Sequence, residues 1–78
     1  MAIRDDLMPW ILEALKANGG SATVLTVCKH IWAHHEPELR RAGDLFYTWQ
    51  YDVRWAATKL RKNHKLRANR PSEPWRLT

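Results

Sequence analysis

The sequence predicts a single α+β domain, mostly helical, with three main helices and a C-terminal β-hairpin. Its 78 residues suffice for one small domain, which excludes a multidomain enzyme. Apolar residues recur with helical spacing up to about residue 63, and beyond that point they alternate with a period of two. A hydrophobic share of 45%, with five tryptophans, is enough for a compact core and argues against a disordered chain.

The first helix is expected to begin near Asp5 or Asp6, whose carboxylates can accept hydrogen bonds from unpaired backbone N–H groups. Pro9 fits only the opening turn of such a helix. The apolar face consists of Ile3, Leu7, Ile11, Ala14 and Leu15. Asn18-Gly19-Gly20 is expected to end the helix, because glycine adopts the left-handed conformation without steric cost.

The second helix is expected to follow residues 21–23, which suit a turn, a cap or a very short strand. Its β-branched residues favour a strand, whereas the apolar spacing as far as Ile31 favours a helix. The apolar positions are Val24, Val27, Cys28, Ile31 and His35. Glu36-Pro37 should break this helix, since a residue before proline is pushed out of the helical region. Residues 37–42 then form a short helical turn closed by Gly43.

The longest periodic segment predicts a helix over about residues 44–63, capped by Asp44 or Thr48. One side is apolar and is expected to be core: Phe46, Trp49, Val53, Ala56, Ala57 and Leu60. The opposite side is a polar stripe: Tyr47, Gln50, Tyr51, Arg54, Thr58, Arg61 and Lys62. This stripe is the largest set of hydrogen-bonding groups that any predicted element presents.

A two-stranded hairpin is expected at the C-terminus, in residues 65–78, with a turn at residues 71–74. Two strands alone are marginal in water, so the apolar residues of the hairpin must pack on the helices. Those residues are Leu66, Ala68, Trp75 and Leu77. The order helix, short strand, helix, long helix, hairpin is that of a winged helix-turn-helix.

The charge is distributed unevenly along the chain. The 13 Lys+Arg and 8 Asp+Glu give a formal net charge of +5. Three bases and five acids lie in residues 1–39, whereas ten bases and three acids lie in residues 40–78. No acid interrupts the seven bases between Arg54 and Arg70. This asymmetry indicates a polyanionic partner, with nucleic acid ahead of a membrane.

Several short motifs carry a resemblance to a known family. Arg54-Trp55-Ala56 followed by Leu60, the closing Trp75-Arg76-Leu77-Thr78 and the upstream Gly19-Gly20 resemble the N-terminal domain of Mrr-type restriction endonucleases, over about residues 19–78. The resemblance implies a winged-helix module that brings a nuclease domain to DNA, with a nuclease or other restriction-system protein as a partner. The nuclease part, with its acidic metal ligands and catalytic lysine, has no counterpart here. The family tends to have glycine where this chain has His64 and Pro74.

The helix over residues 44–63 is expected to lie in the major groove of double-stranded DNA. The expected base-reading residues are Gln50, Arg54, Thr58 and Tyr47. Arginine pairs bidentately with guanine and glutamine with adenine, so Gln50 and Arg54 are the principal candidates. The expected phosphate-binding residues, in the helix end and wing, are Arg61, Lys62, Lys65, Arg67 and Arg70.

Three alternatives remain open for this polar stripe and its basic surroundings. In the first, the stripe is a solvated helix face without a binding role. In the second, the basic face binds an acidic protein partner. In the third, the exposed aromatic side chains stack on the bases of single-stranded nucleic acid. In that last alternative Tyr47 and Tyr51 would be the stacking residues, because Trp55 is expected to be core. The sequence does not indicate the oligomeric state.

No catalytic residue, cofactor or metal is expected. His30 and His34 have a spacing that can chelate a metal, with His35, Glu36 and Cys28 nearby, but no distant third ligand accompanies them, so we interpret them as surface histidines. Cys28 is interpreted as a small buried hydrophobe. The carboxylates are scattered and suit caps and solvated positions. One cysteine and no apolar run of about 20 residues predict a reduced, cytoplasmic protein without membrane contact.

Overall fold

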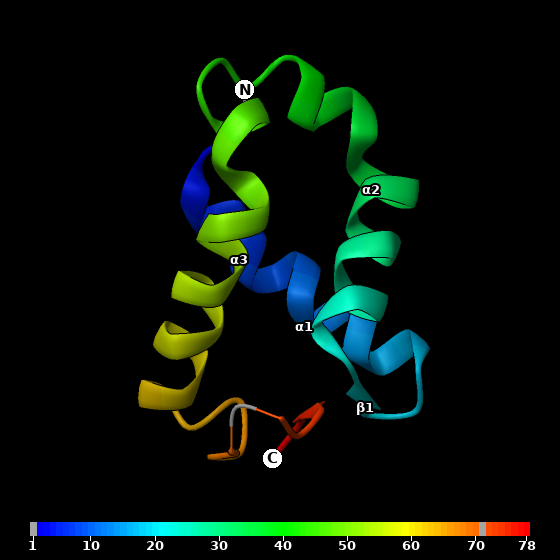
Figure 1. Cartoon of the computed structure of the whole chain (residues 1–78), viewed down its shortest axis with the longest axis vertical. Helices are drawn as coiled ribbons and strands as arrows, with labels where there is room; N and C mark the ends of the chain where they lie inside the picture. The colour runs from blue at the N-terminus through cyan, green and yellow to red at the C-terminus, as the bar shows by residue number, and fades with distance from the viewer. Residues whose placement is uncertain (1, 71) are drawn as a thin grey trace.

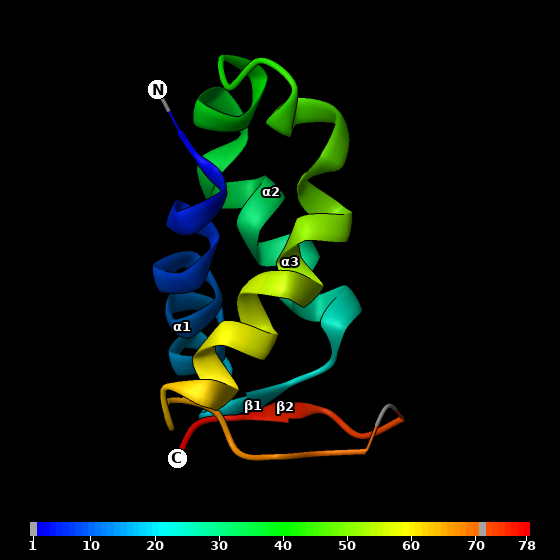
Figure 2. The ribbon, with the colours of Figure 1, turned by 90° about the vertical axis from the view of Figure 1, so that its left-hand side faces the viewer.

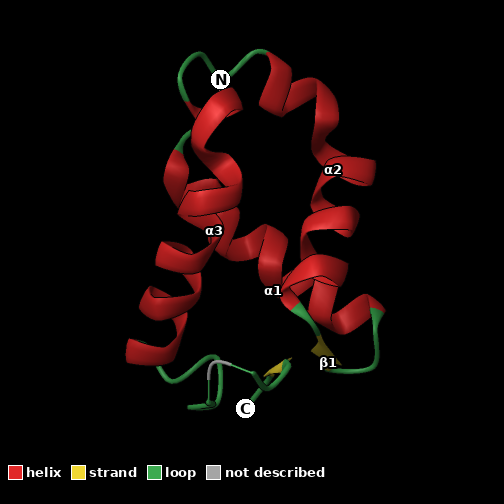
Figure 3. Ribbon diagram, viewed as in Figure 1, coloured by secondary structure: helices red, strands yellow, loops and turns green. Residues whose placement is uncertain are grey.

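The computed structural model describes residues 2–70 and 72–78. The elements, in chain order, are the 3₁₀ turn η1 (Arg4–Asp6), helix α1 (Leu7–Ala17), strand β1 (Ser21–Ala22), helices α2 (Val24–Arg40) and α3 (Leu45–Lys62), and strand β2 (Trp75–Arg76). Helix α1 lies behind the pair formed by α2 and α3 (Figures 1 and 2). The two strands close the end of the molecule opposite the α2–α3 turn (Figure 3). The chain is therefore an α+β molecule with three helices and a two-stranded antiparallel sheet.

Helix α1 begins close to its predicted start and ends as predicted, but the predicted aspartate cap is absent. The Asp6 side chain makes no cap hydrogen bond to α1 and accepts instead from the backbone N–H of Ile3, ahead of the helix, at 2.9 Å. At the other end the Gly20 N–H donates to the Leu15 carbonyl at 2.7 Å, and φ of Gly20 is +98°. Ile3 was expected on the apolar face but is 56% exposed, because it precedes the helix in extended conformation.

Helix α2 forms despite its β-branched residues, and the Thr23 side chain caps it by accepting from the Thr26 N–H at 3.2 Å. The expected break is present one residue before Glu36-Pro37, at His35 (φ −130°, ψ 18°). As predicted, a short helical segment follows it and continues to Arg40. Proline disturbs the preceding turn, but the fully buried Leu39 anchors the rest of the helix to the core.

Helix α3 has the predicted limits within one residue, but neither predicted cap is present. Asp44 is helical and makes no side-chain cap, and the Thr48 hydroxyl donates to Asp52 within the helix at 2.8 Å. Instead the Phe46 N–H donates to the Gly43 carbonyl at 3.1 Å. The buried residues of α3 are Leu45, Trp49, Val53, Ala56, Ala57 and Leu60. Leu45 thus replaces the half-buried Phe46 in the predicted core face.

The predicted C-terminal hairpin forms only in part. Leu66 pairs with Leu77 in an isolated antiparallel bridge, beside which the Arg67 N–H donates to the Arg76 carbonyl at 2.9 Å. The named strand of this segment, β2, pairs instead with β1, which was not predicted and places Ser21 opposite Arg76 and Ala22 opposite Trp75. Leu66 and Trp75 are buried as expected and Leu77 is half-buried, but Ala68 is exposed because the chain leaves the pairing after residue 67.

The described residues of the 67–74 segment, 67–70 and 72–74, therefore form a loop beside the end of α3. The Glu73 N–H donates to the Arg70 carbonyl at 3.0 Å, which closes a turn there, while Pro71 of the predicted turn lies outside the described residues. Over residues 2–70 and 72–78, no helix combines the length and apolar character that crossing a membrane requires.

Candidate functional site

The polar stripe of α3 is exposed except at Arg61, which is half-buried. Among the large hydrophobic side chains of the described residues, Tyr47 and Tyr51 are the most exposed, at 83% and 79%. Gln50, Arg54 and Thr58 are exposed as well. The structure thus brings the four expected base-reading residues together on one side of one helix, opposite its core face, and places Tyr51 beside them.

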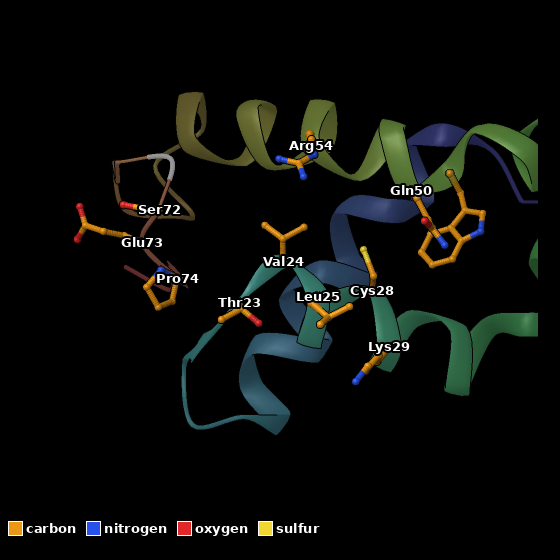
Figure 4. A pocket seen from close by; sticks show the side chains of 11 residues that line it. Thr23, Val24, Leu25, Cys28, Lys29, Gln50, Arg54, Ser72, Glu73 and Pro74 are labelled. Carbon is orange, nitrogen blue, oxygen red and sulfur yellow. The ribbon is translucent and has the colours of Figure 1, made fainter.

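A groove of about 590 Å³ runs between α3, the start of α2 and residues 72–74. Gln50 and Arg54 lie on its α3 side, and Lys29 and Thr23 lie on its α2 side (Figure 4). Its lining also includes the apolar side chains of Val24, Leu25 and Cys28, with Trp49 and Pro74. Sequence reasoning missed Lys29, because an isolated base on another helix carries no periodic signal that would connect it with α3.

Arg61 is engaged inside the protein. Its guanidinium donates to the Asn69 side-chain carbonyl at 3.4 Å and to the Thr58 hydroxyl at 3.2 Å, and the residue is half-buried. The Asn69 amide in turn donates to the backbone carbonyls of Glu73 and Pro74 at 3.1 and 3.4 Å. Arg61 and Asn69 therefore connect the end of α3 to the loop of residues 67–74.

The other expected phosphate-binding residues are free. Lys62, Lys65, Arg67 and Arg70 are exposed, and none of them forms an ion pair within the described ranges. They lie on the last turn of α3 and on the segment that follows it. Four unpaired cations in one region of the chain produce a positive surface potential.

Trp55 packs against the core as expected but remains half-buried. The Arg4 guanidinium carbon lies 3.7 Å from the centroid of its ring, which is a cation–π contact between η1 and α3. The uncovered aromatic faces of α3 are thus those of Tyr47 and Tyr51.

His30 is half-buried, contrary to its interpretation as a surface histidine, whereas His35 is half-buried, in agreement with its predicted place on the apolar face. The His35 ring stacks on Trp10 at 4.1 Å, with Nε2 2.7 Å from a Glu13 oxygen and Nδ1 3.1 Å from Glu38. Both ring nitrogens of His35 thus lie within hydrogen-bond distance of a carboxylate, one on α1 and one on α2. His30 Nε2 is buried 3.5 Å from the same Glu13 oxygen, whereas His34 is exposed. In the described part of the chain no group of three or more ligands could hold a metal.

Glu13 gives the fold a pH dependence. The hydrogen bond from His35 lowers the pKa of Glu13 below its ordinary value. A lowered pKa stabilises the folded state above the ordinary glutamate pKa of about 4.3, and the contribution is lost as pH falls through the folded-state pKa. Glu13→Gln is therefore expected to be less stable than wild type in urea unfolding at pH 6. The difference should shrink at pH 3, and an equal difference at both pH values would contradict this.

Cys28 is half-buried at the floor of the groove. Burial raises the pKa of its thiol, and the charge of Arg54 opposes this rise. A thiol with a raised pKa holds little thiolate at neutral pH, which agrees with its interpretation as a small hydrophobe.

Comparison of the chain with family models, curated proteins and solved structures found no match. Any functional assignment therefore depends on the geometry and charge of the described residues.

Proposed function

We propose that this chain is a winged helix-turn-helix module that binds double-stranded DNA, with α3 in the major groove. The loop of residues 67–74 would be the wing, held beside α3 by Arg61 and Asn69. The order of the helices, with β1 between α1 and α2 and β2 last in the chain, supports this assignment. The major groove is wide enough to admit one α-helix.

One observation carries the proposal: an exposed polar stripe on α3 continues into four exposed, unpaired bases. Arg54 stands in the middle of the stripe, with Gln50 one turn before it. Lys62, Lys65, Arg67 and Arg70 follow at the end of the helix and in the wing. Side chains that reach base edges and side chains that reach phosphates are thus adjacent, as duplex recognition requires.

The proposed roles follow from which atoms are free. Gln50 and Arg54 contact base edges, and Tyr47 contacts them from the preceding turn. The Thr58 hydroxyl donates to the Arg54 carbonyl at 3.1 Å, so Thr58 would contact bases through its methyl group. Arg61 is assigned to positioning the wing rather than to binding phosphate, because its guanidinium is held by Asn69 and Thr58.

The resemblance to the N-terminal domain of Mrr-type restriction endonucleases supports a DNA-targeting role without catalysis of its own, and a nuclease as a partner. The chain departs from the family's pattern at His64, after the long helix. There the backbone is left-handed (φ 60°), which is the conformation that glycine favours. His64 therefore adopts the same turn conformation that a glycine would adopt at this position.

Removing a wing or helix-end cation should weaken binding to every duplex alike. Lys62→Ala and Arg67→Ala are each expected to lower affinity about eightfold at 0.1 M salt and to reduce the log–log salt slope by about 1, since each removes one phosphate contact. Fluorescence anisotropy with several unrelated labelled duplexes measures this.

Lys16→Ala is the matched control, because Lys16 is exposed at the end of α1, outside the proposed interface. Losses from Lys62→Ala and Arg67→Ala no larger than those from the control would contradict the proposed phosphate contacts.

A second candidate is a protein-interaction module that binds an acidic partner. The exposure of Tyr47 and Tyr51 favours it, since tyrosine is enriched at protein interfaces. No binding of a duplex at low salt, together with capture of an acidic protein, would support this candidate instead.

A further inference from the structure

A second hollow, of about 410 Å³, lies between η1 and α3. Its lining consists of Arg4, Tyr51, Asp52, Arg54, Trp55 and Thr58. By helical spacing Trp55 lies on one flank of the exposed stripe, whereas Gln50 and Arg61 lie on the other flank, toward α2 and the wing. The hollow is thus separate from the groove, and Arg54 borders both.

The hollow contains a guanidinium, that of Arg4, which the Trp55 ring positions. The guanidinium of Arg4 stacks on Trp55 at 3.7 Å, and Lys59 Nζ lies 5.8 Å from the same ring. Stacking covers one face of a guanidinium but leaves its in-plane N–H donors free for an oxyanion. Arg4 forms no ion pair within residues 2–70 and 72–78.

The one acidic residue in the lining is already engaged. Asp52 accepts a hydrogen bond from the Thr48 hydroxyl at 2.8 Å. Arg4 and Lys59, the two cations beside the Trp55 ring, exceed this one carboxylate by a single positive charge, without Arg54, which is assigned to base edges. A backbone phosphodiester, which carries one negative charge, matches that excess.

We propose that this hollow binds a phosphate of the DNA backbone, on the strand opposite the one that the wing contacts. The inference rests on the proposed function. A helix in the major groove lies between two sugar-phosphate backbones, and the wing reaches only one of them. Arg4 is the direct phosphate ligand on the other side, and Trp55 is the positioning residue that holds its guanidinium.

Arg4→Ala is expected to lower affinity about eightfold for every duplex at 0.1 M salt and to reduce the salt slope by about 1. Trp55→Leu should cause most of the same loss of affinity. Trp55→Phe should retain binding because it keeps a ring under the guanidinium. The double variant of Arg4→Ala and Trp55→Leu should lose little more affinity than Arg4→Ala alone. Lys16→Ala is again the control. Circular dichroism checks that each variant remains folded.

The outcomes separate this inference from the proposed function. If wild type binds no duplex, both fail. If wild type binds and Arg4→Ala leaves affinity and slope unchanged, only the phosphate site fails, whatever the Trp55 variants do. Duplexes with 5′-hydroxyl and with 5′-phosphate ends distinguish the two sources of phosphate, and an Arg4 effect confined to the 5′-phosphorylated duplex would overturn the assignment to the backbone.

Discussion

Replacing Arg54 with alanine is expected to abolish most of the discrimination between a preferred duplex sequence and random duplexes. Arg54 is exposed at the centre of the α3 stripe and borders both hollows of this face. A bidentate arginine–guanine contact contributes about 1 to 3 kcal/mol of discrimination, so affinity for the preferred sequence should fall about 5- to 150-fold further than affinity for random sequence. Selection of a preferred sequence, followed by competition titrations, measures the difference.

Arg54→Lys is the matched control for charge. Lysine keeps the positive charge but lacks the planar fork, so random binding should be close to that of wild type while discrimination remains low. Equal losses for all sequences in Arg54→Ala would contradict the assignment of α3 as the recognition helix.

Replacing Trp75 with alanine is expected to remove much of the stability of the whole domain. Trp75 is 5% exposed and stands opposite Ala22 in a sheet of only two residue pairs. Truncating a buried tryptophan costs about 3 to 5 kcal/mol, whereas a small domain has about 5 to 15 kcal/mol in total. Urea unfolding should show a midpoint far below that of wild type.

The physical reason is that Trp75 connects the C-terminal segment to the helices. The wing has little pairing of its own, because Leu66 and Leu77 form a single bridge. Trp75→Phe keeps a ring in the core and should therefore lose clearly less stability than Trp75→Ala. If the free energy of unfolding of the alanine variant lies within about 1 kcal/mol of the wild-type value, the claim that Trp75 connects the C-terminal segment to the core is contradicted.

The helices were predictable because local spacing determines them. The apolar positions of α1 and α3 repeat every three or four residues, and the structure buries them. In α2, Pro37 predicted both the break and the short helical segment after it, and the kink at His35 lies one residue before the predicted Glu36-Pro37. Burial of Leu39, a tertiary effect, holds that segment to the core.

The strand pairing and the contact of Arg4 with Trp55 depend on segments that are distant in the sequence. Ser21 and Arg76 are far apart in sequence, so alternation alone suggested pairing of the C-terminal segment with its neighbour. The exposure of Gln50 and Arg54 followed from the helical wheel, but the involvement of Arg4 follows only from its stacking on Trp55 across two elements.

The most direct test is a fluorescence-anisotropy titration of the protein into a labelled random duplex at two salt concentrations, with a single strand as competitor. Contacts from Arg4, Lys62, Lys65, Arg67 and Arg70 predict a log–log salt slope of about −4.5 and a preference for the duplex. No binding of the duplex at low salt, or stronger binding of the single strand, would contradict the account of α3 and the wing as a duplex-binding surface.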